Sequence, residues 1–173
     1  MPRCVISLLL LAALLPVEAS AQYRQYVRRT VQTIDLSGPR VGVTFLSSAV
    51  RELAGRRGED IGPVISQFGW QIERRFLTGA GGATGVTEFV GLIGGADQGV
   101  LLPSLSWLVG FRTARGLEFA AGPNLGVSGT ALALAAGVTF QAGSLNVPVN
   151  LAVVPSKVGT RVSVLAGFNM RRP

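Results

Sequence analysis

The chain has 173 residues, of which 16 are basic and 9 are acidic, and its formal net charge is +7 with one cysteine and no histidine. The absence of histidine excludes Ser-His hydrolases, the usual zinc sites and acid–base catalysis by imidazole. In an exported protein this positive charge indicates anionic lipid or lipopolysaccharide rather than nucleic acid as a partner. A simpler explanation of the many arginines than specific anion binding is that they reflect genome composition and anchor the protein at a membrane interface.

Residues 1–21 predict a signal peptide that is not part of the fold. Arg3 supplies the positive charge, "VISLLLLAALLPV" supplies the apolar stretch, and "ASA" at 19–21 is a small-residue cleavage site. The apolar stretch is shorter than the roughly 20 residues that a helix needs to cross a bilayer. We therefore expect an exported protein. Removal of this segment also removes Cys4, which excludes disulfides and thiolate metal sites in the mature chain.

The next two predicted segments are an N-terminal extension and a short helix. Residues 22–37 carry arginines and tyrosines that suit a periplasmic tail, an interface anchor or an extra strand, and the sequence does not decide between these. Within 48–60, "SAVRELAGRRGED", apolar residues recur with helical spacing over 48–57. No other segment after residue 38 has this periodicity.

The rest of the chain after residue 38 alternates with the period of β-strands. In "LLPSLSWLVGFRT", Leu105, Trp107 and Phe111 fall on one side, and Ser104 and Arg112 fall on the other. A helix would not separate odd from even residues in this way. Eight strands are predicted, at 39–47, 63–77, 84–94, 100–113, 116–127, 130–142, 145–154 and 157–170.

The turns predict which residues pair across the last four hairpins, because loop length and turn chemistry set the register. In every predicted pairing the apolar side of one strand meets the apolar side of the next, as expected for a single sheet. The expected pairs are Arg112 with Glu118, Leu125 with Leu132, Phe140 with Val147, and Asn150 with Arg161.

The apolar side of this sheet is predicted to face lipid. The opposite side is rich in Gly, Ala, Ser and Asn, and the only lysine is Lys157, which does not suit a face exposed to water. Small residues suit the interior of an eight-stranded barrel. A charge on the lipid face at mid-membrane would cost ~2–4 kcal/mol, and the apolar side carries none between 100 and 169 except near turns. The sequence predicts an all-β fold, an eight-stranded antiparallel up-and-down barrel over 38–173.

The segments "GPRVGVTFLS", "ISQFGWQIERRF", "LPSLSWLVGFRT", "GLEFAAGPNL" and "LNVPVNLAVVPSKVGTRVSVLAGFN" together resemble a known group of proteins. They are similar to small bacterial outer-membrane β-barrels of the OmpA/OmpX-like architecture, and more closely to a group of uncharacterised exported barrels. The resemblance covers residues 38–170. It implies a membrane barrel inserted by the barrel-assembly machinery, and it implies no molecular activity.

Two groups of charged or polar residues are candidate sites. The inward-facing group could form a proton path, a ligand site or an acid–base pair, but a salt-bridged plug of the interior is the favoured interpretation. Three arginines in the helical segment could bind lipopolysaccharide phosphates, although a solvated loop is the simpler interpretation. The glycine-rich stretch 79–85 lacks the Lys-Ser/Thr of a phosphate-binding loop. The inward group is Glu73, Glu88, Arg112, Glu118, Asn150 and Arg161, and the arginines are Arg51, Arg56 and Arg57.

Three functional hypotheses follow from these patterns. The leading one is a non-enzymatic barrel of the bacterial outer membrane with a structural or surface-interaction role. The second is a barrel, periplasmic or membrane-associated, that binds an apolar or lipid ligand. The third, a lipid-modifying enzyme of the outer membrane, is disfavoured because the chain has no histidine. We expect no enzymatic activity, no cofactor, no metal site and no nucleic-acid partner.

Overall fold

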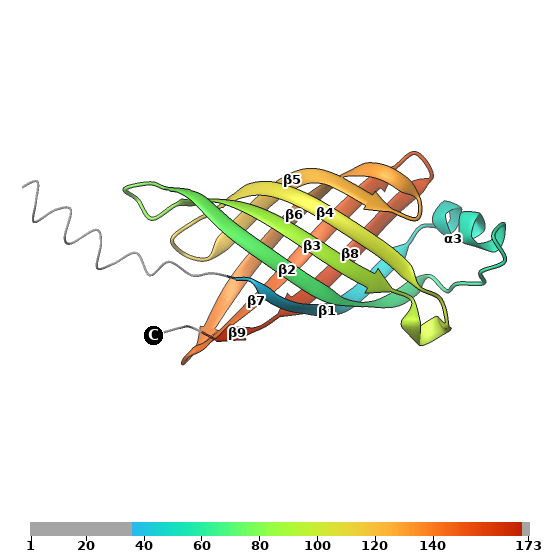
Figure 1. The fold of residues 1–173 in the computed structure, drawn as a ribbon, viewed down its shortest axis with the longest axis horizontal. Helices are drawn as coiled ribbons and strands as arrows, with labels where there is room; N and C mark the ends of the chain where they lie inside the picture. The colour runs from blue at the N-terminus through green and yellow to red at the C-terminus, as the bar shows by residue number, and fades with distance from the viewer. Residues whose placement is uncertain (1–35, 171–173) are drawn as a thin grey trace, which may run out of the picture. The chain divides into compact units, whose positions relative to one another are not determined.

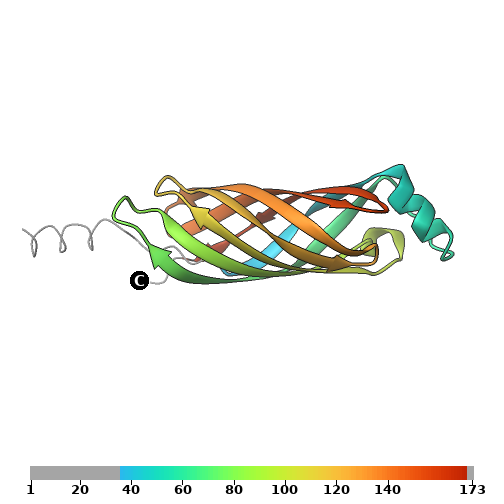
Figure 2. The same ribbon diagram turned by 90° about the horizontal axis from the view of Figure 1, so that it is seen from above.

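The computed structural model describes residues 36–170, and the predicted signal peptide and residues 22–35 of the predicted extension lie outside them. The described chain forms a closed antiparallel β-barrel (Figures 1 and 2), which confirms the predicted fold class. Its strands are β1 (Gly38–Leu46), β2 (Val64–Thr78), β3 (Thr84–Gly94), β4 (Leu102–Arg112), β5 (Leu117–Gly126), β6 (Gly129–Ala142), β7 (Leu145–Ser156) and β8 (Gly159–Gly167). Each strand pairs with the next along the chain, and β1 pairs with β8 to close the barrel. A two-residue strand, β9 (Asn169–Met170), pairs with the start of β7.

Two short helices lie in connections at one end of the barrel. Helix α3 (Ser48–Gly55) follows β1, where the sequence predicts a helix, and the 3-10 helix η1 (Ala96–Gln98) follows β3, where it predicts none. Over the described residues, no helix is long and apolar enough to cross a membrane.

Two of the four predicted hairpin registers are confirmed. Arg112 lies opposite Glu118 across β4 and β5, and Phe140 lies opposite Val147 across β6 and β7. The inward and outward sides of these strands therefore match as the alternation predicts.

The predicted registers of the other two hairpins are wrong. The turn between β7 and β8 begins after Ser156, so Pro155 lies inside the strand instead of opening the turn. The turn between β5 and β6 begins one residue earlier than predicted. These changes move the partner of Leu125 by two residues and the partner of Asn150 by four. Because side chains alternate with period two and both numbers are even, each residue keeps its predicted side of the sheet. The pairs present are Leu125 with Thr130, and Asn150 with Leu165.

The outward side of every one of the eight strands carries large apolar side chains that are exposed. Trp70 is 56% exposed and Trp107 is 51% exposed, values that are unusual for side chains of this size. We call this surface the apolar belt. Its members are Val41, Val43, Phe45, Phe68, Trp70, Ile72, Phe89, Ile93, Leu105, Trp107, Val109, Phe111, Leu117, Phe119, Leu125, Leu132, Leu134, Phe140, Leu151 and Val164.

Helix α3 packs against the end of the barrel that carries η1 (Figure 1). Its buried residues Val50 and Ala54 contact an apolar cluster formed with Leu46, Ile65 and Leu102, which come from three strands. This packing buries the apolar side of a helix that is too short to be stable alone.

The connection that contains η1 holds the start of β2 in place. The side chain of Gln98 accepts a hydrogen bond from the Gly62 N–H at 2.6 Å and donates one to the Val64 carbonyl at 2.6 Å. The Asp97 carboxylate accepts hydrogen bonds from the hydroxyl and the backbone N–H of Ser66, at 2.6 and 3.0 Å. The Ser66 hydroxyl and N–H favour the charged form and hold the pKa of Asp97 below its ordinary value.

Gly69 lies where β2 and β3 approach too closely for a side chain. A Cβ at Gly69 would be 2.0 Å from the Gly91 carbonyl oxygen, whereas a Cβ at Gly91 would meet its nearest neighbour, Leu105 Cδ1, at 4.0 Å. We expect Gly69→Ala to destabilise the barrel by about 1–3 kcal/mol, because the strands must move apart. Gly91→Ala is the matched control and should change stability by less than ~0.5 kcal/mol. Urea unfolding followed by circular dichroism measures both, and equal stabilities would contradict the prediction.

Candidate functional site in the barrel interior

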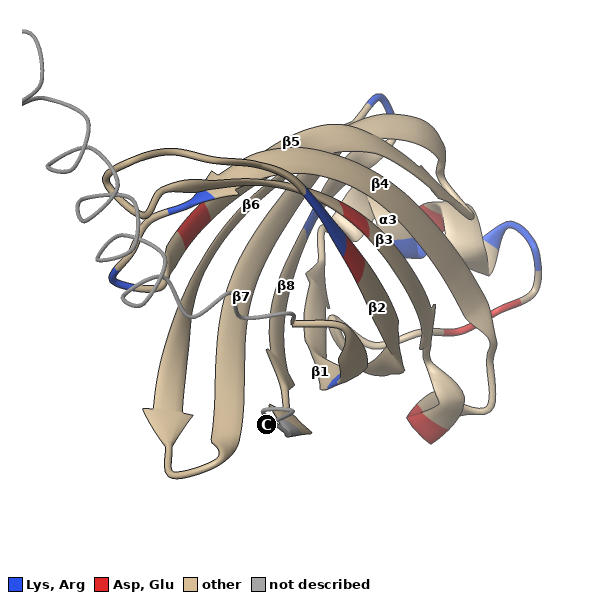
Figure 3. Ribbon diagram, turned by 60° about the vertical axis from the view of Figure 1, so that its left-hand side comes forward, with Lys and Arg blue, Asp and Glu red and all other residues tan. Residues whose placement is uncertain are grey.

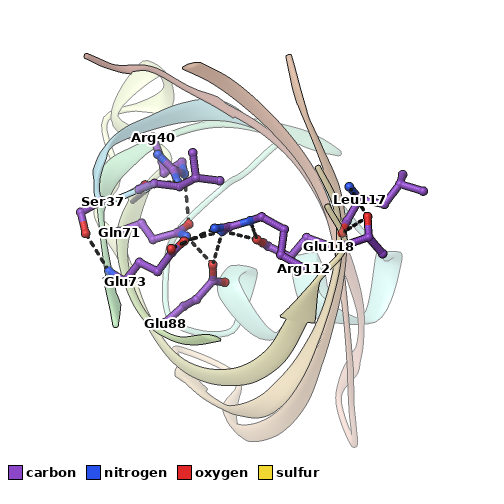
Figure 4. A network of polar contacts seen from close by, with 10 residues as sticks. Ser37, Arg40, Gln71, Glu73, Glu88, Arg112, Leu117 and Glu118 are labelled. Atoms are coloured by element: carbon purple, nitrogen blue, oxygen red, sulfur yellow. Dashed lines mark hydrogen bonds and ion pairs between the residues drawn. The ribbon is translucent and has the colours of Figure 1, made fainter. Parts of the chain in front are cut away.

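The strongest cluster of charges in the described structure surrounds Arg112, the last residue of β4 (Figure 4). Its Nε donates a hydrogen bond to Glu118 Oε2 at 2.7 Å, and one terminal nitrogen donates to Glu73 Oε1 at 2.9 Å. The other terminal nitrogen forms ion pairs with Glu73 and Glu118 and lies 3.9 Å from Glu88 Oε1. All four side chains are buried. We call these four residues the Arg112 cluster.

The strand registers explain why these residues meet. Glu118 is directly opposite Arg112 across β4 and β5, and Glu73 is directly opposite Glu88 across β2 and β3. Two carboxylates in directly opposed positions repel one another. The guanidinium of Arg112 reaches across β3 and offsets this repulsion with a planar set of donors that matches carboxylate oxygens.

Neutral groups complete the hydrogen bonding of the cluster. Gln71 Nε2 donates to Glu88 Oε1 at 2.6 Å, and Gln71 Oε1 accepts from Arg40 Nε at 3.1 Å. Arg40 also donates to the Leu36 carbonyl at 2.7 Å. The backbone N–H of Glu73 donates to the Ser37 hydroxyl at 2.9 Å. Thus the last two residues of the predicted extension, 36 and 37, contact the barrel interior.

The Arg112 guanidinium offsets part of the negative charge of the three glutamates in the cluster. Carboxylate oxygens of Glu73, Glu88 and Glu118 lie within 4.8 Å of one another, a spacing that could hold a cation. The guanidinium of Arg112 already supplies a positive charge to all three. A hydrolase would need its acid and base in contact with substrate, whereas these carboxylates are each less than 5% exposed.

Asn150 and Arg161 do not belong to the Arg112 cluster, although the alternation of the strands predicts one inward group that includes them. Arg161 donates to Asn124 Oδ1 at 2.6 Å, and Asn150 lies opposite Leu165 instead of Arg161. The physical reason is the turn between β7 and β8, which places Arg161 opposite Val154, four residues further along β7 than the predicted partner Asn150. Arg161 is therefore near the end of the barrel that carries α3.

Several interior polar residues were not singled out from the sequence. Thr44 donates to Gln67 Oε1 at 2.5 Å and its hydroxyl is 2.7 Å from that of Ser163, while Asn124 Nδ2 donates to both Ser104 and Ser106 at 2.9 Å. The alternation alone could have identified them. All lie on the inward side of their strands, between outward apolar residues.

The three arginines near α3, Arg51, Arg56 and Arg57, share no hydrogen-bond partner among the described residues. All three are exposed. Arg51 Nε donates to the Ile61 carbonyl and Arg57 donates to the Val127 carbonyl, both at 3.3 Å. The structure places them at the end of the barrel opposite the Arg112 cluster.

No family model matches this chain, and comparisons with curated proteins and with solved structures found no significant match.

Proposed function

We propose that this protein is a non-enzymatic barrel of the bacterial outer membrane with a structural or surface-interaction role. The observation that carries the proposal is the apolar belt, which occurs on all eight strands. Figure 3 supports it, because many of the Lys, Arg, Asp and Glu residues lie in the connections and near strand ends. Six charged residues within the strands are buried: Arg40, Glu73, Glu88, Arg112, Glu118 and Arg161. In water such a surface would be a strong aggregation liability, whereas in lipid it is the expected outer face of a barrel.

The height of the belt fits a bilayer. On β2 the outward positions run from Ser66, which is bound to Asp97, to the exposed Arg74, with only Phe68, Trp70 and Ile72 between them. Eight residue steps of ~3.3 Å on a strand tilted by ~40° span about 20 Å along the barrel axis. The apolar band of outer-membrane barrels is ~25 Å tall.

A polar pair inside the belt also supports a lipid environment. Trp107 Nε1 donates a hydrogen bond to the Thr87 hydroxyl at 2.9 Å, and that hydroxyl donates to the Leu108 carbonyl at 3.2 Å. In water neither group would need a protein partner, whereas in hydrocarbon an unpaired donor costs several kcal/mol.

The interior weighs against the ligand-binding alternative. Two cavities lined by interior residues of the described chain have volumes of about 30 and 60 Å³. Pockets for drug-sized ligands occupy roughly 300–1,000 Å³, so neither cavity could accept a lipid chain.

The proposed orientation places the barrel end with α3 outside the cell. If the N-terminus is periplasmic, the first connection, which carries α3, faces outward, where outer-membrane barrels have their longer loops. Arg51, Arg56 and Arg57 would lie where lipopolysaccharide phosphates are found, which makes that lipid the proposed surface partner. Membrane insertion would require the barrel-assembly machinery.

Fractionation of cells that express the full chain tests the proposal. We expect the protein in the sarkosyl-insoluble membrane fraction, cleaved before Gln22, and migrating differently in gels before and after boiling because the folded barrel resists detergent. Recovery as a freely soluble periplasmic protein would contradict the proposal. A further comparison replaces Arg51, Arg56 and Arg57 with glutamine, which should weaken binding to lipopolysaccharide vesicles without changing the gel shift.

A further inference from the structure

Arg161 is a buried cation without a counter-charge in the described structure. Its side chain points inward from β8 and the residue is 8% exposed. Among residues 36–170, ion pairs within 4.0 Å involve Arg112 and its three glutamates, and none involves Arg161. Its one hydrogen bond goes to Asn124 Oδ1 at 2.6 Å, and its buried Nε has no partner.

The neighbours of Arg161 fix its position but do not neutralise it. Asn124 donates through Nδ2 to Ser104 and Ser106, which turns its Oδ1 toward Arg161. An amide oxygen offers one hydrogen bond and no net charge. An unpaired charge in a protein interior costs several kcal/mol, so this arrangement calls for a negative charge nearby.

A cavity with suitable size and donors adjoins Arg161. It has a volume of about 60 Å³, and its lining includes Arg161 and the hydroxyl-bearing residues Ser104, Ser106 and Ser163. Glu88, which also lines this cavity, is already held by Gln71 and Arg112. A space of this size accepts a few waters or one small ion and excludes larger organic ligands.

We infer that this cavity binds one small monovalent anion, with chloride as the simplest example, against the guanidinium of Arg161. Arg161 has no carboxylate within 4.0 Å among the described residues, so a monovalent anion would pair with its guanidinium one to one, whereas a divalent anion would bring an additional negative charge into a cavity that Glu88 already lines. The ion would accept hydrogen bonds from Arg161 and serine hydroxyls. The inference concerns the interior and does not rest on the proposed location of the protein.

Stability in different salts tests the inference on the purified full chain. At equal ionic strength, we expect sodium chloride or bromide to lower the unfolding equilibrium constant relative to sodium gluconate, whose anion is too large for the cavity. The expected change is about tenfold when the halide is at about ten times its Kd. Arg161→Gln should abolish this difference. Lys157→Gln, an exposed change on the same hairpin, should retain it.

Crystals grown with bromide give a second measurement that does not depend on the folding of a variant. An anomalous peak within hydrogen-bond distance of Arg161 would support the inference. Equal stability of the wild type in halide and gluconate would overturn it, as would bromide found only at the surface.

Discussion

Replacing Arg112 with methionine is expected to destabilise the barrel by about 3–5 kcal/mol. The change removes the only cation that bonds to Glu73 and Glu118 and lies near Glu88 among the described residues, and it leaves three carboxylates together in the interior. Removing one partner of a buried ion pair is much more costly than removing both, because the remaining charge stays unsolvated. Urea unfolding of the folded barrel in detergent micelles, followed by tryptophan fluorescence, measures the loss.

Two further variants isolate the cause of this loss. Arg115→Met removes an exposed arginine in the turn beside Arg112, and it should change stability by less than ~0.5 kcal/mol. Adding Glu73→Gln and Glu118→Gln to Arg112→Met removes two of the three unpaired carboxylates, leaving Glu88, and should recover part of the stability. If the Arg112 and Arg115 variants are equally stable, or the combined variant is the least stable, the cluster does not act by balancing charge.

Leu134→Arg is expected to cost ~2–4 kcal/mol and to reduce assembly in the membrane sharply. Leu134 is an outward residue of β6 within the apolar belt and is 47% exposed. If lipid covers this side chain, an arginine there must enter hydrocarbon. If water covers it, an arginine on an exposed position should change stability by no more than ~0.5 kcal/mol. The amount of heat-modifiable protein in the membrane fraction measures assembly.

The matched control is Thr130→Arg, which lies on the same side of the same strand but next to the turn. The cost of a charge on the lipid face falls to about 0–1 kcal/mol near the interface, so this variant should assemble. Ala135→Ser, on the inward side, should also be mild. Equal assembly of the Leu134 and Thr130 variants would show that the apolar belt does not face lipid.

The sequence predicts the barrel and its two faces because alternation with period two is a local property that survives errors in register. The shift at the turn between β7 and β8 illustrates the limit. The side of Arg161 is predicted correctly, yet its predicted partner on β7 is wrong by four residues. The side of the sheet on which a residue lies depends only on whether its position in the strand is odd or even. The residue that lies opposite it on the next strand depends on which turn forms.

The Arg112 cluster is predictable in part for the same reason. The pair of Arg112 with Glu118 follows from one tight turn. The position of Glu73 opposite Glu88 depends on an irregularity in the pairing between Arg75 and Leu77, which no turn signal reveals. Arg112 reaches Glu73 across an intervening strand because the barrel is curved. This curvature is a property of the closed sheet and not of any one strand.

The pairing of β1 with β8 has a consequence for how the chain matures. Residues 40 and 167 are partners, so the two edges of the sheet meet only after almost the whole chain has been synthesised. Contacts between such distant segments slow folding, and until they form both edge strands offer unpaired backbone groups to other chains. Any shortened product that lacks the last strand keeps these open edges. The newly made polypeptide therefore needs these two edges kept from pairing with other chains until β1 and β8 meet.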